Sequence, residues 1–211
     1  MSAGLLIVTA VPAEAEAVRA GLSSTTVTVA PVGVGPAAAG AGTARLLALA
    51  EAGGQPYQAV ISAGIGGGFP NRVALGTIVL ATRSIAADLG AESPEGFLPL
   101  DELGFGPSSA PADPALLERL REALPRATVG AVITCSTVTG TSESARALAA
   151  RYPDAVAEAM EGYGVATAAS QAGVPFAELR TISNPVGPRD RGAWRITEAF
   201  EALRSAAAAL R

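Results

Sequence analysis

The sequence predicts an α/β fold: one domain with a mixed, mostly parallel central sheet that is flanked by helices. Short apolar runs rich in branched side chains alternate with helical segments along the chain, which is typical of parallel strands joined by crossover helices. The length of 211 residues fits one domain, and hydrophobic residues make up 49%, enough for a sizeable core. No repeat, charge block or linker divides the chain, so we expect residues 1–211 to form a single domain.

Each expected strand is a short apolar or β-branched run that ends at glycine or at polar residues. Residues 5–9 (LLIVT) are apolar almost throughout, as in a strand buried on both faces. The run 59–63 (AVISA) leads into a glycine-rich segment, 64–68, which is expected to be a loop. The expected strands, in chain order, are 5–9, 25–34, 59–63, 76–87, 129–134 and 174–182.

Helices are expected where a helix-start signal precedes an Ala-rich segment. Pro12, Pro36 and Pro114 each stand at a first-turn position, where the fixed φ of proline suits a helix, and Gly53 ends the second helix. The expected helices, in chain order, are 12–22, 36–51, 114–124, 142–151, 159–171 and 197–210. Residues 88–112 are rich in Gly, Pro and acidic residues, and predict a long loop that covers a site or forms an interface.

The composition excludes several classes of function. All 15 basic residues are Arg, against 19 acidic ones, and the net charge of −4 predicts no general binding of nucleic acid or of an anionic membrane. The absence of histidine excludes Ser-His-Asp and Cys-His catalysis. Cys135, the single cysteine, follows an apolar run and is expected in the core, so neither a disulfide nor a multi-cysteine metal site is expected.

The sequence also predicts where the protein works. No apolar stretch reaches the roughly 18 residues that a membrane-spanning helix needs. The first residues lack the positive charge of a signal peptide, and the apolar run after them leads into Glu14 and Glu16. We therefore expect a cytoplasmic protein without a membrane partner.

Polar residues that follow the strands are the candidates for a site, because ligands of α/β sheets bind beyond the carboxyl ends of the strands. These candidates are Glu14, the glycine segment 64–68, Thr139, Glu161 and Asn184. Glu161 lies among Ala, Met and Gly, and a carboxylate in such surroundings is either paired or functional. The others also have structural interpretations: a tight turn for the glycines, a solvated helix face for Glu14, and a turn at Asn184 before proline.

The ordered combination of motifs resembles the nucleosidase branch of the purine nucleoside phosphorylase superfamily, whose familiar members are methylthioadenosine/S-adenosylhomocysteine nucleosidases. The motifs are AVPAEAEA after the first strand, VGVGPAAAG, SAGIGGG, EAMEGYGVA and RTISN. The resemblance covers nearly the whole chain and implies a nucleoside phosphorylase-like fold of three layers. It also implies a small nucleoside substrate, no metal and no organic cofactor, and a homodimer or higher homo-oligomer in which a second subunit completes the site beside residues 88–112.

The resemblance implies roles for residues around the sugar. Glu14 falls where the family has the carboxylate that activates water, and Arg180 matches an arginine near that water. Glu161 matches the glutamate that holds the ribose hydroxyls, and Met160 matches the methionine that packs on the sugar. Ile65 stands where the familiar pattern has a serine.

Further matches lie around the base. Gly64 and Gly66 belong to the glycine motif at the nucleoside. Val138 and Thr139 match the segment that lines the base, and Trp194 falls near an aromatic residue that covers the nucleoside.

Asn184 is the informative departure from the adenosine-type nucleosidases, which have an aspartate there. An amide offers N–H donors, and a 6-oxopurine presents acceptors at both N7 and O6, so Asn184 favours hypoxanthine over adenine. An asparagine in this place resembles the futalosine hydrolase family. That resemblance implies cleavage of futalosine to hypoxanthine and dehypoxanthine futalosine, in the futalosine route to menaquinone, with Glu14 and Asn184 as catalytic residues.

Three alternatives remain at this level. One is a methylthioadenosine/S-adenosylhomocysteine-type nucleosidase that tolerates Asn184. Another is a non-catalytic nucleoside-binding domain on the same fold, which the presence of both Glu14 and Glu161 disfavours. The third is a phosphorylase, but this chain has Ser62 where phosphorylases of the superfamily have a phosphate-binding arginine.

Overall fold

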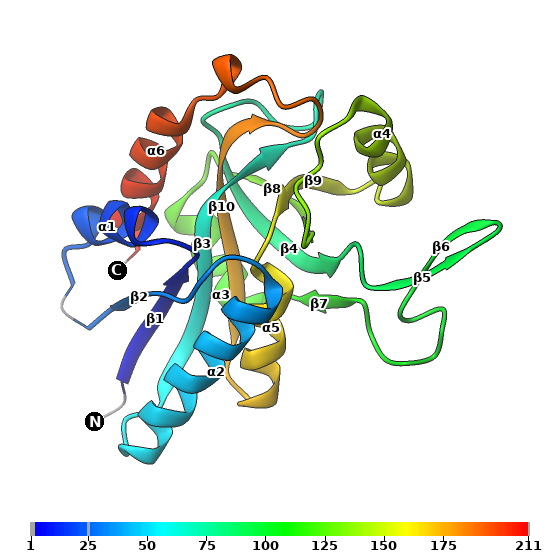
Figure 1. Cartoon of the computed structure of the whole chain (residues 1–211). Helices are drawn as coiled ribbons and strands as arrows, with labels where there is room; N and C mark the ends of the chain where they lie inside the picture. Colours follow the sequence, from blue (N-terminus) through cyan, green and yellow to red (C-terminus); the bar gives the residue numbers. More distant parts are fainter. Residues whose placement is uncertain (1–2, 25, 211) are drawn as a thin grey trace.

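The computed structural model describes residues 3–24 and 26–210, and its main sheet is built from eight strands (Figure 1). The strands of this sheet are β1 (Ala3–Thr9), β2 (Thr28–Pro31), β3 (Tyr57–Gly68), β4 (Ile78–Ala86), β7 (Ser109–Pro111), β8 (Thr128–Thr134), β9 (Ala155–Ala159) and β10 (Phe176–Pro185). A separate hairpin consists of β5 (Gly90–Ser93) and β6 (Gly96–Pro99). The helices are α1 (Pro12–Gly21), α2 (Pro36–Ala52), α3 (Pro114–Ala123), α4 (Ser142–Arg151), α5 (Gly162–Gln171) and α6 (Ile196–Ala209), with a 3₁₀ turn at Arg191–Ala193.

The main sheet closes on itself. Its strands follow the order β10-β4-β8-β9-β3-β1-β2, and β10 also pairs with β3, so that five strands form a ring. The prediction of a mixed, mostly parallel sheet flanked by helices is confirmed in part: five of the eight strand pairs are parallel, but the sheet is closed and is not an open layer between helices. Strand β10 runs antiparallel to β4, β9 antiparallel to β3, and β7 antiparallel to β4, although the remaining pairs are parallel.

The two longest strands make this closure possible. Strand β3 pairs with β1, β10 and β9 at different points along its length, and its last residues are glycines, which let a strand bend closely against its neighbours. The pairing of β10 with β3 shifts register between Ile182 and Asn184, as at a β-bulge, and a bulge increases strand bending. Sequence periodicity carries no signal for such closure, which arises from tertiary pairing.

Five of the six helices in the described residues pack on the sheet in two groups, and α4 packs separately. Helices α1 and α6 pack together, and with α3 they bury a core against β1, β3 and β10 (Figure 1). Helices α2 and α5 pack together over the other surface of the same strands, around Val60 and Val165. Cys135 lies in a third cluster and is 4% exposed, which confirms its assignment to the core.

The helix predictions are confirmed except at one segment. Residues 159–171 are expected to be helical throughout, but helix α5 begins at Gly162, and Ala159 is the last residue of β9. The Ala-rich stretch of β9 has low strand propensity, and it is a strand because β8 and β3 supply hydrogen bonds on either side.

Three segments differ from the expected strands and loops. The glycine segment 64–68 is the end of β3 and not a loop, because β10 pairs with it along its length. Residues 88–112 contain β5, β6 and β7, and the β5–β6 hairpin projects from the body of the molecule (Figure 1). The expected strand over 25–34 is shorter, Thr28–Pro31, and position 25 lies outside the described residues. Within the described residues, no helix is long and apolar enough to cross a bilayer.

Candidate active site

Glu14 lies in the first turn of α1, just beyond the carboxyl end of β1, and is 3% exposed. Its Oε2 accepts hydrogen bonds from the backbone N–H groups of Ala10 at 2.9 Å and Val11 at 3.2 Å. Its Oε1 accepts a third from the N–H of Ile65 at 2.9 Å. A carboxylate has about four acceptor positions, so three are filled and one remains open. The solvated interpretation of Glu14 is wrong, because the backbone of β3 holds this side chain in the interior.

Glu161 precedes α5 and meets an arginine from β10. It is 6% exposed, and its Oε2 lies 3.3 Å from Nη1 of Arg180. Its Oε1 accepts a hydrogen bond from the N–H of Gly35, in the loop between β2 and α2, at 3.2 Å. The carboxylate of Glu161 is therefore paired, as its apolar sequence surroundings predict, and it joins three separate parts of the chain.

Arg180 is 1% exposed and uses its guanidinium in three directions. Nη1 faces Glu161, Nη2 donates to the hydroxyl of Ser62 at 2.9 Å, and Nε donates to Glu178 at 2.8 Å. The hydroxyl of Ser84 donates to the other carboxylate oxygen of Glu178. Neither Glu178 nor Ser84 was singled out from the sequence. The available signal was an acidic residue inside the apolar run of β10, two positions before Arg180.

The end of β3 brings Glu14 and Arg180 to one place. A Cβ atom at Gly64 would lie 2.6 Å from Oε1 of Glu14 and 2.8 Å from Nη1 of Arg180. A side chain at this position would therefore displace one of the two charged groups. Two residues further along β3, a Cβ atom at Gly66 would lie 2.8 Å from the carbonyl oxygen of Glu158.

Asn184 sits at the bulged end of β10, opposite Gly67 of β3. Its Oδ1 accepts from the hydroxyl of Ser183 at 2.8 Å, and its Nδ2 donates to the carbonyl of Pro185 at 3.0 Å. These neighbours fix the orientation of the amide and occupy one of its two N–H groups. The second N–H is available to a ligand.

The residues expected to line the base lie on a segment that a buried acid holds. Thr139 is 8% exposed, and both its N–H, at 2.9 Å, and its hydroxyl donate to the carboxylate of Glu158 on β9. Val138 is 36% exposed. Met160 is half-buried and lies between β9 and Glu161. Glu158 was not singled out from the sequence, and no cation pairs with it among the described residues.

Trp194 follows the 3₁₀ turn and is half-buried, with the guanidinium carbon of Arg189 5.5 Å from its ring centroid. The N–H of Arg195 donates to the carbonyl of Ser183 at 2.7 Å, so this segment is attached to the end of β10 beside Asn184. The structure thus places Trp194 at the same end of the sheet as Asn184.

Burial dominates the electrostatics of the acids. It raises the pKa of Glu14, an effect that the N–H of Ile65 and the charge of Arg180 partly offset. Burial also raises the pKa of Glu158 and Glu178, with Thr139 acting against it at the first and Arg180 at the second. Neighbouring carboxylates raise the pKa of Arg180, which stays protonated despite its burial. The site therefore holds a carboxyl group, Glu14, that binds protons more tightly than a solvated glutamate does.

The predicted residues thus fall into one connected group and one neighbouring group. Glu14, Gly64, Ile65, Glu161 and Arg180 are linked directly by the contacts given above. The neighbouring group lies on the adjoining ends of β3, β9 and β10 and on the segments attached to these ends. Its members are Met160, Gly66, Val138, Thr139, Asn184 and Trp194.

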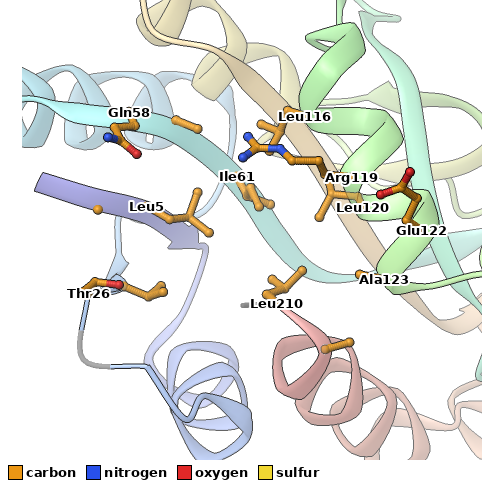
Figure 2. Close-up of a pocket in the computed structure, with 14 residues that line it drawn as sticks. Leu5, Thr26, Gln58, Ile61, Leu116, Arg119, Leu120, Glu122, Ala123 and Leu210 are labelled. Atoms are coloured by element: carbon orange, nitrogen blue, oxygen red, sulfur yellow. The ribbon is translucent and has the colours of Figure 1, made fainter. Parts of the chain in front are cut away.

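A pocket of about 640 Å³ lies elsewhere, at the opposite end of the parallel strands (Figure 2). Its walls come from the first residues of β1 and β3, from α3 and from the end of α6, and include Leu5, Gln58, Leu120 and Leu210. No predicted site residue lines it. The catalytic interpretation therefore rests on the side-chain network at the carboxyl ends of β1, β3 and β10.

Comparison with known proteins identifies the family and the fold of the chain. The family model described as "Phosphorylase superfamily" matches residues 8–211. A crystal structure of a methylthioadenosine/S-adenosylhomocysteine nucleosidase from Colwellia psychrerythraea, in complex with adenine, superimposes with a TM-score of 0.80. It is 20% identical in sequence, and the match covers 100% of this chain and 96% of that one, so it shows a common fold.

Two futalosine hydrolases are more similar to the chain in sequence than this nucleosidase is. The chain is 55% identical to a futalosine hydrolase of Streptomyces coelicolor over 153 residues, which cover 72% of this chain and 65% of that protein. It is 46% identical to a futalosine hydrolase of Acidothermus cellulolyticus over 226 aligned positions, which cover 100% of this chain and 91% of that protein. The first match thus spans slightly less than two thirds of its relative, whereas the second spans nearly all of it.

Proposed function

The chain belongs to the phosphorylase superfamily, among the futalosine hydrolases, and from this premise we propose that it hydrolyses the N-glycosidic bond of futalosine. The products are hypoxanthine and dehypoxanthine futalosine, and the reaction belongs to the futalosine route to menaquinone. The observation that carries the proposal is Glu14: a buried carboxyl group with three backbone donors, one open acceptor position and Arg180 and Glu161 beside it.

Glu14 acts as the general base. Cleavage passes through an oxocarbenium-like state in which positive charge grows on the ribose. A water bound at the open position of Glu14 attacks the anomeric carbon from the face opposite the base, and Glu14 takes its proton. A raised pKa suits this role, because a base works best when its pKa lies near the operating pH.

Glu161 binds the 2′- and 3′-hydroxyls of the ribose. Each of its oxygens has one protein partner, Gly35 or Arg180, and keeps acceptor capacity for a hydroxyl. The negative charge of Glu161 beside the sugar favours the developing positive charge. Met160, next to it, packs on the sugar.

Asn184 recognises and stabilises the leaving base. Its free N–H donates to the acceptor edge of hypoxanthine, and that hydrogen bond strengthens as the base gains negative charge. Val138 and Thr139 line the base, Trp194 covers the nucleoside, and Gly64, Ile65 and Gly66 form the floor at β3.

Water is a better nucleophile for this site than phosphate. A phosphate dianion needs free cationic or dense amide donors. The guanidinium of Arg180 is already shared among Glu161, Glu178 and Ser62, and Ser62 replaces the arginine of the phosphorylases. Three donors of Arg180 are thus engaged within the protein, and this favours hydrolysis.

The proposal is tested by incubating the protein with futalosine, with and without inorganic phosphate, and measuring free hypoxanthine by mass spectrometry. We expect equal release in both conditions. Release that requires phosphate would identify a phosphorylase. Faster turnover of methylthioadenosine than of futalosine would identify an adenosine-type nucleosidase, and binding of futalosine without any turnover would identify a non-catalytic domain.

We also infer that residues 1–211 form a single domain and that the protein is a homo-oligomer. Phe105 follows the β5–β6 hairpin in the sequence and is 78% exposed. A large apolar side chain that is exposed to this extent suits an interface between copies of the chain. Sedimentation velocity is expected to give a mass of at least two chains, and Phe105→Asp is expected to lower it. The cytoplasmic location stays a prediction from the sequence.

A further inference from the structure

Glu178 is a buried carboxylate that the mechanism above does not use. It lies on β10, is 0% exposed, and has two side-chain partners. Ser84 of β4 donates to one carboxylate oxygen, and Nε of Arg180 donates to the other at 2.8 Å. Burial raises the pKa of Glu178, so keeping this side chain charged in the interior costs folding free energy.

A buried ion pair is weak grounds for a purely structural role, because an apolar pair of similar volume is often as stable. The orientation of Arg180 offers a better explanation. Arginine presents its donors in a rigid planar fork. With Nε held by Glu178 and Nη2 by Ser62, the remaining terminal nitrogen, Nη1, is directed at Glu161.

Glu178 also contacts the start of the helix that follows Glu161. A Cβ atom at Gly162 would lie 2.2 Å from Oε2 of Glu178, so only glycine leaves room for the carboxylate there. Glu161 is the N-cap residue of the same helix, α5. Glu178 therefore touches both the arginine and the helix end that together position Glu161.

The charges around Glu14 give Glu178 a second effect. Three buried carboxylates surround one guanidinium: Glu14 from α1, Glu161 from the start of α5, and Glu178 from the same strand as Arg180. The positive charge of Arg180 favours the ionised form of Glu14, and an over-stabilised carboxylate is a weak base. A negative charge at Glu178 offsets this influence.

We infer that Glu178 is a positioning residue for hydrolysis: it directs the guanidinium of Arg180 toward Glu161 and offsets its charge, so that Glu14 remains basic. The inference rests on the proposed function. It assigns to Glu178 an action through Arg180, without contact with the substrate.

The test is the pH profile of kcat/KM for futalosine in Glu178→Gln, whose amide keeps the shape and can still accept from Arg180. Removing the charge is expected to move the acidic limb toward lower pH by about half a unit to one unit. It is also expected to lower the plateau several-fold, because Glu14 becomes a weaker base. Thr181→Val is the matched control, since Thr181 is buried on the same strand and its hydroxyl has no hydrogen-bond partner among the described residues. It should leave the limb in place.

Ser84→Ala provides a second variant: it keeps the Glu178 carboxyl group but removes the Ser84 hydrogen bond, a bond that lowers the pKa of Glu178 and so favours its charged form. It should move the limb in the same direction by a smaller amount, and it decides the question if Glu178→Gln does not fold, as judged by thermal melting. An unchanged limb in folded Glu178→Gln, or in Ser84→Ala where the first variant does not fold, overturns the inference alone. Failure of the wild-type protein to release hypoxanthine overturns the proposed function and, with it, the inference.

Discussion

Glu14 combines an interior location with an incomplete set of hydrogen bonds. Three backbone N–H groups, from Ala10, Val11 and Ile65, fix both of its oxygens. Burial raises its pKa, while the N–H groups of Ile65 and Val11 and the charge of Arg180 act in the opposite direction and favour the carboxylate. The residue is therefore arranged to accept one proton from one further ligand.

Replacing Glu14 tests this role directly. Glu14→Gln keeps the side-chain shape but cannot take a proton, so we expect kcat for futalosine to fall by about 10²- to 10⁴-fold. Affinity should change little, because Glu161 and Asn184 carry the contacts to sugar and base. Hypoxanthine release gives the rate and isothermal titration calorimetry the affinity. Full activity in the variant would show that another group activates water.

Asn184 is where substrate choice is decided at the scale of one residue. In Asn184→Asp, an oxygen replaces Nδ2 and faces the carbonyl of Pro185, now 3.0 Å from Nδ2. Two acceptors at that separation favour a protonated acid. The single proton of such an acid points at Pro185, so the side chain presents only acceptor oxygens to a ligand, which suits the 6-amino group of adenine and not the acceptor edge of hypoxanthine.

We expect Asn184→Asp to change the ratio of kcat/KM for futalosine over methylthioadenosine by about 10-fold or more in favour of the adenine nucleoside. Parallel assays of both substrates with wild-type and variant protein measure this ratio. An unchanged ratio would mean that the base is selected by other residues, such as those around Thr139.

The sequence predicts some of the buried acids of the site and misses others. Glu161 could be found because an acid in apolar surroundings needs a partner, and the partner is Arg180. Glu178 and Glu158 have the same signature, an acid inside an apolar run, but apart from Arg180, two residues after Glu178, their partners Ser84 and Thr139 come from other segments. Without those pairings, the sequence does not separate them from solvent-exposed acids.

At the scale of secondary structure, β3 does the most to assemble the site. Its backbone N–H at Ile65 holds Glu14, and its glycines let Glu14 and Arg180 approach the strand closely. The same strand pairs with β9, which carries Glu158, and with β10, which carries Arg180 and Asn184.

A methyl group on β3 should therefore disable the site. In Gly64→Ala, the new Cβ would lie within 3 Å of both Glu14 and Arg180, and one must move. A displacement of about 1 Å at reacting groups costs on the order of 100-fold in rate. The expected result is a loss of futalosine hydrolysis of that size in a protein that still folds, as checked by thermal melting.

Gly53→Ala is the control for this substitution. Gly53 follows α2, has a φ of −78° and is exposed, so alanine fits its backbone conformation. Its activity should equal that of the wild-type protein. Wild-type activity in Gly64→Ala would contradict the close approach of the two charged groups at β3.

Element prediction succeeded where local signals agree with the tertiary structure. Proline at the first turn marks α1, α2 and α3 correctly, and α4 has the predicted bounds. It missed β9, whose last residue, Ala159, was assigned to a helix, and it was wrong at the end of β3, where the glycine segment was expected to be a loop. At both places strand pairing outweighs local propensity, and pairing partners are not visible in local sequence patterns.

For the whole molecule, buried acids make stability depend on pH. Burial raises the pKa of Glu14, Glu158 and Glu178 above the ordinary glutamate value of 4.5. Relative to the unfolded chain, the folded state therefore shifts each of these acids toward its neutral form, and this contribution to stability is complete below about pH 4.5. It is lost as the pH rises through the folded-state pKa values.

Glu158→Gln isolates one of these groups. Glutamine cannot ionise, so the variant should gain thermal stability relative to the wild-type protein as the pH rises from 4.5, and the difference should level off once Glu158 is ionised in the folded state. Melting temperatures of both proteins at intervals between pH 4.5 and 8.5 measure it, about 2–4 °C for each kcal/mol. A difference that is constant across this range would show that Glu158 titrates normally.

Closure of the main sheet leaves it with two short terminal strands, β2 and β7, and the last residue of each is a proline, Pro31 and Pro111. A proline has no N–H to donate, so each outer ladder is interrupted where another chain would need to dock. The protein is thereby guarded against growth into fibrils by strand addition. Concentrated samples should accordingly stay free of thioflavin-positive aggregates for as long as the ring remains intact.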